Sequence, residues 1–109
     1  MTTKFTWYGH ATLGLETSGY KIIVDPFFSG NPAASSSAEA VEADFILISH
    51  GHGDHVGDAI ALAKRTDATI ISVNEIAVWC GAVGQSKDFG SFKNFRSLVK
   101  SYLLALRNL

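Results

Sequence analysis

Several kinds of feature are scarce in this 109-residue sequence, and each scarcity excludes a class of protein. A single cysteine, Cys80, excludes an internal disulfide framework. No apolar run is long enough to cross a bilayer, so a membrane partner is not expected. A net charge of −1 gives no electrostatic reason to expect nucleic acid. The first ten residues lack the apolar core of a secretory signal, so we expect a cytoplasmic protein.

The composition is that of a folded protein, with 47% hydrophobic and 17% charged residues. The charges are unevenly distributed along the chain. All ten acidic residues precede residue 89, whereas the last 21 residues carry four basic residues and no acid. We therefore expect a globular unit over residues 1–84 and a basic helical tail over residues 85–109.

Residue patterns predict an alternation of strands and helices. Strands rich in aromatic and β-branched residues are expected first, then a loop of turn-forming residues, then a strand buried on both faces. The predicted strands cover 4–8, 11–17, 20–24, 44–49 and 68–73; the loop covers 29–37, a short helical turn 38–43, and helices 56–66 and 75–81. Ser18-Gly19 predicts a hairpin turn, and Asp25-Pro26 ends the third strand. The later strand–helix–strand order predicts an α/β fold with functional residues at the carboxyl ends of parallel strands.

From residue 92 onward, apolar residues recur at steps of three and four, which predicts an amphipathic helix. One interpretation is that its apolar stripe covers core surface and supports a homo-oligomer. The alternative is a cationic helix that lies on an anionic membrane or engages a partner.

The stretch "SHGHGDHVGD", residues 49–58, places three of the four histidines within six positions. His50 and His52 alternate in a turn and can face one point, and Asp54 and His55 can face a second point nearby. Gly51 and Gly53 allow the backbone to fold tightly there. Imidazole and carboxylate ligands suit a divalent metal, with zinc expected first and iron or manganese as alternatives. The stretch therefore predicts a metal site.

These residues follow an apolar strand and form the pattern H-x-H-x-D-H. Together with "WYGHATLGLET" and "KIIVDPFFSGNP", the stretch resembles the metallo-β-lactamase superfamily, in the branch of small metal-dependent hydrolases related to the ascorbate-6-phosphate lactonases. The resemblance covers residues 4 to about 73. It implies the N-terminal βα half of a four-layered αββα sandwich, with two metal ions bound between the halves.

The resemblance also implies a role for each motif residue. His50 and His52 match ligands of the first metal, and Asp54 and His55 match ligands of the second. Asp54 also orients the attacking hydroxide, Asp25 supports the site from nearby, and His10 matches a histidine close to the active site. Cys80 and the aromatic residues of "FTWY" and "DPFF" are interpreted as packing or loop-anchoring residues.

The expected function is metal-dependent hydrolysis of a small ester, lactone, amide or phosphodiester by a metal-activated hydroxide. No histidine follows His55, although the family takes further ligands from a second half. We therefore expect a truncated or frame-shifted relative whose family pattern ends near residue 76. The alternatives are a metal-binding fragment without turnover and an interaction module that acts through the basic helix.

Overall fold

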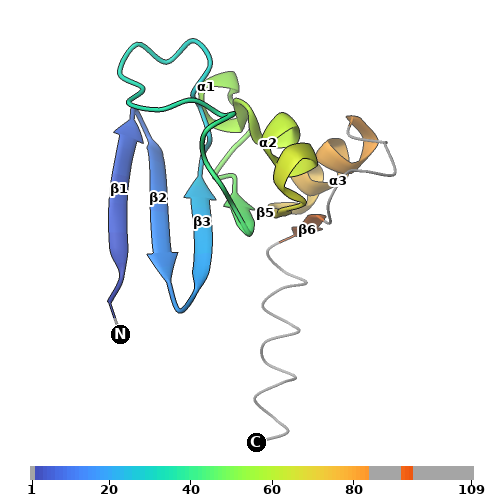
Figure 1. Ribbon diagram of the computed structural model, residues 1–109. Helices are drawn as coiled ribbons and strands as arrows, with labels where there is room; N and C mark the ends of the chain where they lie inside the picture. The colour runs from blue at the N-terminus through green and yellow to red at the C-terminus, as the bar shows by residue number, and fades with distance from the viewer. Residues whose placement is uncertain (1, 84–91, 95–109) are drawn as a thin grey trace, which may run out of the picture.

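The computed structural model describes residues 2–83 and 92–94, and its helices and strands alternate as predicted (Figure 1). The N-terminal strands are β1 (Lys4–Gly9), β2 (Thr12–Thr17) and β3 (Tyr20–Val24). The second group of elements is β4 (Phe45–Leu47), α1 (Gly53–Val56), α2 (Ala59–Thr66), β5 (Thr69–Ser72), α3 (Asn74–Val83) and β6 (Phe92–Asn94). All five predicted strands are therefore present, and the α/β class is confirmed.

The six strands form one sheet in the order β1-β2-β3-β4-β5-β6. The first three strands pair antiparallel, and β3 to β6 pair parallel to one another. Ser18 and Gly19 form the hairpin turn with φ of 53° and 82°, which matches the right-handed twist of the flanking strands. The connection from β4 through α2 to β5 confirms the predicted βαβ unit.

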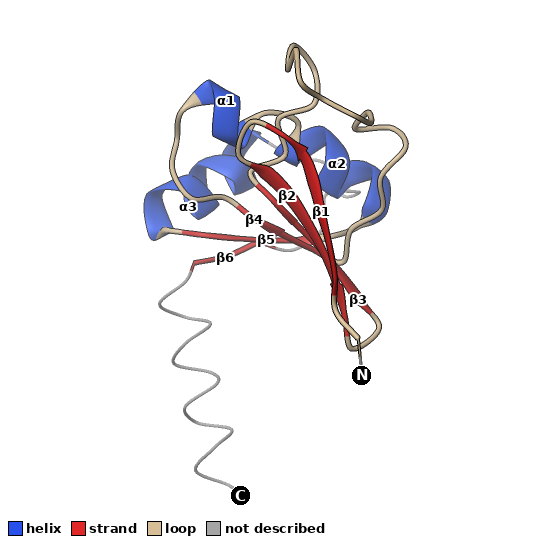
Figure 2. Ribbon diagram, turned by 90° about the vertical axis from the view of Figure 1, so that its left-hand side faces the viewer, coloured by secondary structure: helices blue, strands red, loops and turns tan. Residues whose placement is uncertain are grey.

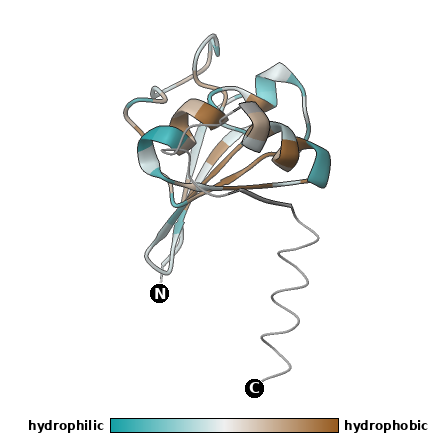
Figure 3. Cartoon of the chain, turned by 90° about the vertical axis from the view of Figure 1, so that its right-hand side faces the viewer, coloured by the Kyte–Doolittle hydropathy of each residue, from teal (hydrophilic) through white to brown (hydrophobic). Residues whose placement is uncertain are grey.

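The helices all lie on one face of the sheet (Figure 2). Ile23, Ile46 and Ile70 are register neighbours on this face and are at most 3% exposed. They form one core cluster with Leu62 and Ala63 of α2. Hydrophobic segments lie along these helices in Figure 3, and the buried residues of α2 are Ala59, Leu62 and Ala63, as an amphipathic helix requires.

The opposite face of the sheet is apolar and less buried within residues 2–83 and 92–94, although Ile71 of β5 on this face is only 7% exposed. Phe45 and Leu47 of β4 are only partly buried, so the prediction of a strand buried on both faces is wrong for this part of the chain. Phe5 and Trp7 of β1 are 61% and 60% exposed, so neither is a core residue, whereas the indole of Trp7 anchors the turn after β1 by donating to the His10 carbonyl. The apolar run 44–49 therefore predicted burial correctly only for the face that the helices cover, because no described helix lies on the opposite face.

The helix predicted over residues 56–66 is divided into α1 and α2 at Gly57, which has a φ of +46°. A Cβ atom at this position would lie 2.4 Å from the carbonyl oxygen of Pro26, so only glycine fits. The next residue, Asp58, donates its backbone N–H to the same carbonyl over 2.8 Å. The break therefore seats the start of α2 against the loop that follows β3.

Two other elements differ from the predictions. The short helical turn predicted over residues 38–43 is present as a turn over 38–40 only, and 41–43 have no regular structure. The carbonyls of Ala38 and Val41 accept hydrogen bonds from the Arg65 guanidinium. Residues 92–94 form strand β6, which corrects the predicted helix start at residue 92. The rest of that predicted helix lies outside the described residues. Within residues 2–83 and 92–94, no helix has the length and apolar character needed to cross a membrane.

Candidate metal centre

The predicted site residues gather at one end of the sheet (Figure 1). The strands β3, β4 and β5 all run toward this end, and the turn between β1 and β2 lies there as well. The loop after β4 carries His50 and His52 and leads into α1, which carries Asp54 and His55. Functional residues at the carboxyl ends of parallel strands are the arrangement that the βαβ unit predicts.

Asp25 is the buried acid of the site. It ends β3 with a φ of 47°, a left-handed conformation that aspartate tolerates better than most residues. Its Oδ1 accepts the backbone N–H of Ser49 over 2.7 Å. Its Oδ2 accepts the Ser49 hydroxyl over 2.6 Å and lies 2.9 Å from Nδ1 of His55. Asp25 therefore orients the loop after β4 and one imidazole, and the supporting role in a metal site that the resemblance implies stays a prediction.

Three donor groups converge beside it. His10 Nε2 lies 3.3 Å from Asp54 Oδ2, and His55 Nε2 lies 3.8 Å from Asp54 Oδ1. One ligand atom from each of His10, Asp54 and His55 lies within 4.8 Å of the other two. Donors around one tetrahedral zinc ion are separated by about 3.4 Å, since each lies about 2.1 Å from the metal. The donor set therefore fits a divalent metal ion.

His50 and His52 lie beside this group without joining it. The ring centroid of His50 is 4.7 Å from that of His52 and 3.9 Å from that of His55. The ring of His10 contacts that of His55 at 5.3 Å. All four histidines of the sequence thus form one chain of ring contacts. The division into one pair of ligands at His50 and His52 and a second pair at Asp54 and His55 remains a prediction.

His10 reaches the site because of the local backbone. The pairing of β1 with β2 shifts register between Trp7 and Gly9, a bulge of the kind that often redirects a side chain near a functional site. Gly9 and His10 then both adopt positive φ, of 106° and 54°. The indole of Trp7 donates to the His10 carbonyl over 2.8 Å, and the Phe27 ring lies edge-on to the imidazole. His10 is therefore held toward the site rather than pointing away at a hairpin bend.

The sequence analysis missed three residues that build this end of the molecule: Ser49, Asp58 and Thr12. Asp58 accepts the backbone N–H groups of Phe28 and Ser29, each over 2.9 Å. The hydroxyl of Thr12 is buried, donates to the Asp25 carbonyl over 2.7 Å and accepts the N–H of Phe27 over 3.1 Å. Ser49 and Asp58 stand at the two ends of the quoted stretch, so their proximity to the histidines in sequence was the available signal.

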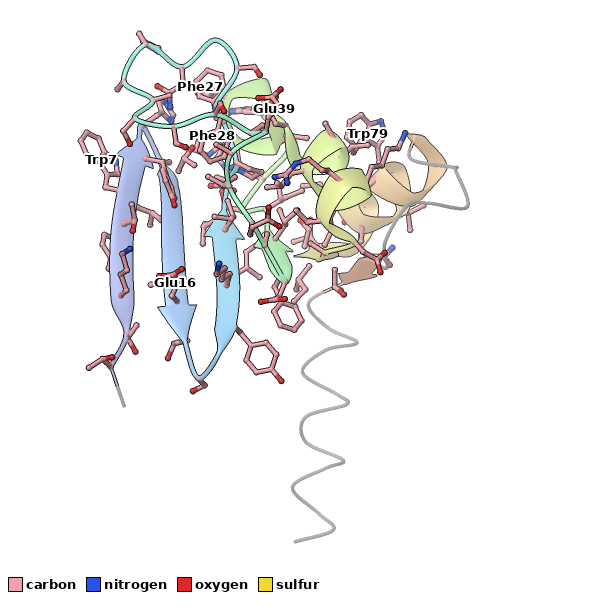
Figure 4. All side chains as sticks on the ribbon, in the orientation of Figure 1. Trp7, Glu16, Phe27, Phe28, Glu39 and Trp79 are labelled. Atoms are coloured by element: carbon pink, nitrogen blue, oxygen red, sulfur yellow. The ribbon has the colours of Figure 1, made fainter. Side chains whose placement is uncertain are left out.

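The aromatic pair after Asp25 anchors the same loop. Phe27 and Phe28 lie at this end of the sheet close to α1 (Figure 4). Phe28 is buried and packs edge-on against Tyr8 at 5.4 Å between ring centroids, so its packing interpretation is confirmed. Cys80 is likewise buried in the core, and burial raises the pKa of its thiol.

Residues 4–91 match the family model of the β-lactamase superfamily domain. The chain belongs to this superfamily. The match extends past the last motif that the sequence analysis used, so the expected end of the family pattern near residue 76 is corrected to at least residue 91.

The chain is similar to several proteins that are named metal-dependent hydrolases. A UPF0173 metal-dependent hydrolase of Methanopyrus kandleri is 47% identical over 81 residues, which are 74% of this chain and 35% of that protein. A UPF0173 metal-dependent hydrolase of Heliobacterium modesticaldum is 50% identical over 93 residues, covering 77% of this chain and 39% of that protein. The chain therefore spans little more than a third of these curated relatives.

Among solved structures, the superfamily chain is similar to Igni18, a metallo hydrolase of Ignicoccus hospitalis. The TM-score is 0.73 at 31% identity, and the match covers 84% of this chain and 39% of that one. The fold class and the resemblance to metal-dependent hydrolases are therefore confirmed.

Proposed function

We propose that this chain carries the first half of the metal centre of a hydrolase. The observation that supports this most strongly is the convergence of His10, Asp54 and His55, whose ligand atoms lie within 4.8 Å of one another. The contact of His55 Nδ1 with the buried Asp25 adds to it, because ligating histidines in metalloproteins are commonly oriented by a carboxylate on the second ring nitrogen.

Zinc suits these nitrogen and oxygen donors, and iron and manganese suit them also. His10, Asp54 and His55 would hold one ion, and His50 and His52 would contribute to a second. A divalent metal held there supplies a Lewis acid and lowers the pKa of a water molecule that it binds.

The side chains around this candidate site have separate roles in the proposed function. Asp54 faces His10 with one oxygen and His55 with the other, so it can orient a water molecule by accepting its hydrogen bond. Asp25 keeps His55 in one orientation from the buried side. The His10 side chain is 42% exposed, so a substrate could reach the ion that His10 would help to hold.

We propose a small ester, lactone, amide or phosphodiester as substrate, acted on in the cytoplasm. Each of these has an electrophilic carbon or phosphorus that an activated water can attack. Since the chain spans 35% and 39% of the two relatives described above, a complete centre would need further ligands from outside this chain. We also propose a homo-oligomer, because a second copy of the chain is one source of such ligands.

Zinc titration of metal-free protein by calorimetry tests the proposal. Asp54→Asn should weaken zinc binding by about a hundredfold or more, because it removes a charged ligand between two histidines. Asp67→Asn is the matched control, since Asp67 lies at the end of α2 in a left-handed conformation that asparagine accepts. Equal zinc affinity in the two variants would contradict the proposal.

The second candidate is a metal-binding chain without turnover, since this chain covers 35% and 39% of the two relatives. A screen of the four substrate classes with zinc-loaded protein separates the two. Hydrolysis that is lost in Asp54→Asn supports the enzyme, whereas zinc binding without hydrolysis of any class supports the second candidate.

A further inference from the structure

Ser49 lies between the buried acid and the first histidine of the H-x-H-x-D-H stretch. It follows β4 directly, and its hydroxyl oxygen has a polar neighbour on each side. Oγ lies 2.6 Å from Asp25 Oδ2 and 2.9 Å from Nδ1 of His50. The backbone N–H of Ser49 also donates to Asp25 over 2.7 Å, so the serine is held against the carboxylate at two points.

The hydrogens in this chain of contacts can be assigned from the donors and acceptors. An ionised carboxylate only accepts hydrogen bonds, so the single hydroxyl hydrogen of Ser49 points to Asp25. Ser49 Oγ then faces His50 with its lone pairs and can only accept a hydrogen bond from it. Nδ1 of His50 must therefore be the donor. By the same reasoning, Nδ1 of His55 carries the hydrogen that Asp25 accepts.

Both rings therefore carry their hydrogen on Nδ1 and leave a lone pair on Nε2. An imidazole that makes no such contact prefers the opposite tautomer in water, with the hydrogen on Nε2, and that tautomer cannot bind a metal through Nε2. The direction of the Ser49 hydroxyl depends on Asp25, because a serine alone can donate to Nδ1 as readily as accept from it.

We propose that Ser49 is a positioning residue: Asp25 fixes the direction of the Ser49 hydroxyl, and that direction fixes the tautomer of His50. One buried carboxylate then sets the tautomers of two histidines, His55 by direct contact and His50 through the serine hydroxyl. The consequence for metal binding rests on the proposed function, in which Nε2 of His50 is a ligand atom. The tautomer itself is a property of the metal-free protein and does not depend on that function.

The test measures the ring nitrogen chemical shifts of metal-free, 15N-labelled protein at alkaline pH, where the imidazoles are neutral. In the unmodified protein, His50 and His55 should both show Nδ1–H. Ser49→Ala should move His50 toward Nε2–H and leave His55 unchanged, while Ser49→Thr, which keeps a hydroxyl, should retain Nδ1–H at His50. Ser72→Ala is the matched control, since it deletes a buried hydroxyl at the end of β5 that donates to the Ile48 carbonyl.

The same four proteins are then titrated with zinc. Ser49→Ala should bind zinc about tenfold more weakly, within the range seen when partners of metal ligands are removed, and Ser49→Thr and Ser72→Ala should bind as the unmodified protein does. An unchanged His50 tautomer in Ser49→Ala overturns the proposal. A changed tautomer with unchanged zinc affinity supports the positioning role of Ser49 and contradicts His50 as a metal ligand. If the unmodified protein shows the Nδ1–H tautomers and binds no zinc, the proposed function fails while the tautomer assignment stands.

Discussion

The two faces of the sheet are built from similar residues and have opposite environments. Along the covered face, Ile23, Ile46 and Ile70 stand in register beneath the helices and are at most 3% exposed. Along the open face, Phe5 pairs with Leu15 and Trp7 pairs with Leu13, and both aromatic side chains are about 60% exposed. Strand alternation decides which residues share a face, and the elements packed above decide whether that face is buried.

The candidate metal centre lies between these two environments. The site stands at the end of the sheet, where the turn after β1 and the loops after β3 and β4 meet. Its acid, Asp25, is buried, whereas His10 is half exposed. The covered side thus supplies rigid support, and the ligand atoms remain accessible.

The largest expected effect comes from placing a charge beneath the covered face. Ala63 of α2 is fully buried in the core cluster, while Ala61 on the same helix is exposed. Ala63→Asp should lower the free energy of unfolding by about 4 kcal/mol or more, because the carboxylate has no partner there. Ala61→Asp has the same helix propensity cost and should lose less than about 1 kcal/mol. Urea unfolding followed by circular dichroism measures both; similar losses would mean that α2 does not pack as described.

A cavity should lower the free energy of unfolding more on the covered face of the sheet than on the opposite face. Ile46 and Leu47 are neighbours in β4, and only Ile46 faces the helices. Ile46→Ala should lower the free energy of unfolding by about 3 kcal/mol, within the range for fully buried aliphatic residues. Leu47→Ala should lower the free energy of unfolding by about 1 kcal/mol, since the partly buried Leu47 side chain makes fewer contacts that the substitution would remove. An equal loss in urea unfolding would show that the face called open here is covered.

The pH dependence of stability tests burial on the α3 side of the covered face. Burial raises the pKa of the Cys80 thiol above its value in the unfolded chain. Its neutral form is therefore favoured by folding, so this contribution is complete below the unfolded pKa and is lost as the pH rises toward the folded pKa. The urea midpoint should fall with alkaline pH more steeply in the unmodified protein than in Cys80→Ala. Parallel pH profiles would contradict the buried thiol.

The smallest effect is expected on the open face. Phe5 is 61% exposed. Phe5→Thr should change the free energy of unfolding by about 0.5 kcal/mol, because threonine also suits a strand and little burial is lost. It should reduce the binding of a hydrophobic fluorescent dye, which reports exposed apolar surface. A loss as large as that of Ile46→Ala would instead indicate that Phe5 is buried by another chain or segment.

The strands and most of the site were predictable because their signals are local. Ser18-Gly19, Asp25-Pro26 and the alternation of apolar residues act over a few positions, and each marks an element within two or three residues of its observed end. The break at Gly57 was not predictable in the same way. It depends on the carbonyl of Pro26, which a Cβ atom would meet at 2.4 Å.

The sequence by itself determined the order of the elements, the α/β class and the cluster of metal-ligating residue types, because backbone preference and ligand chemistry belong to single residues and their neighbours. Only the tertiary structure decided which face of the sheet is covered and which groups meet at its end. It places Asp25 against both Ser49 and His55, 24 and 30 positions away, and brings His10 to Asp54. Contacts between distant segments depend on how the strands pair and how the helices pack, and no local pattern of residues carries that information.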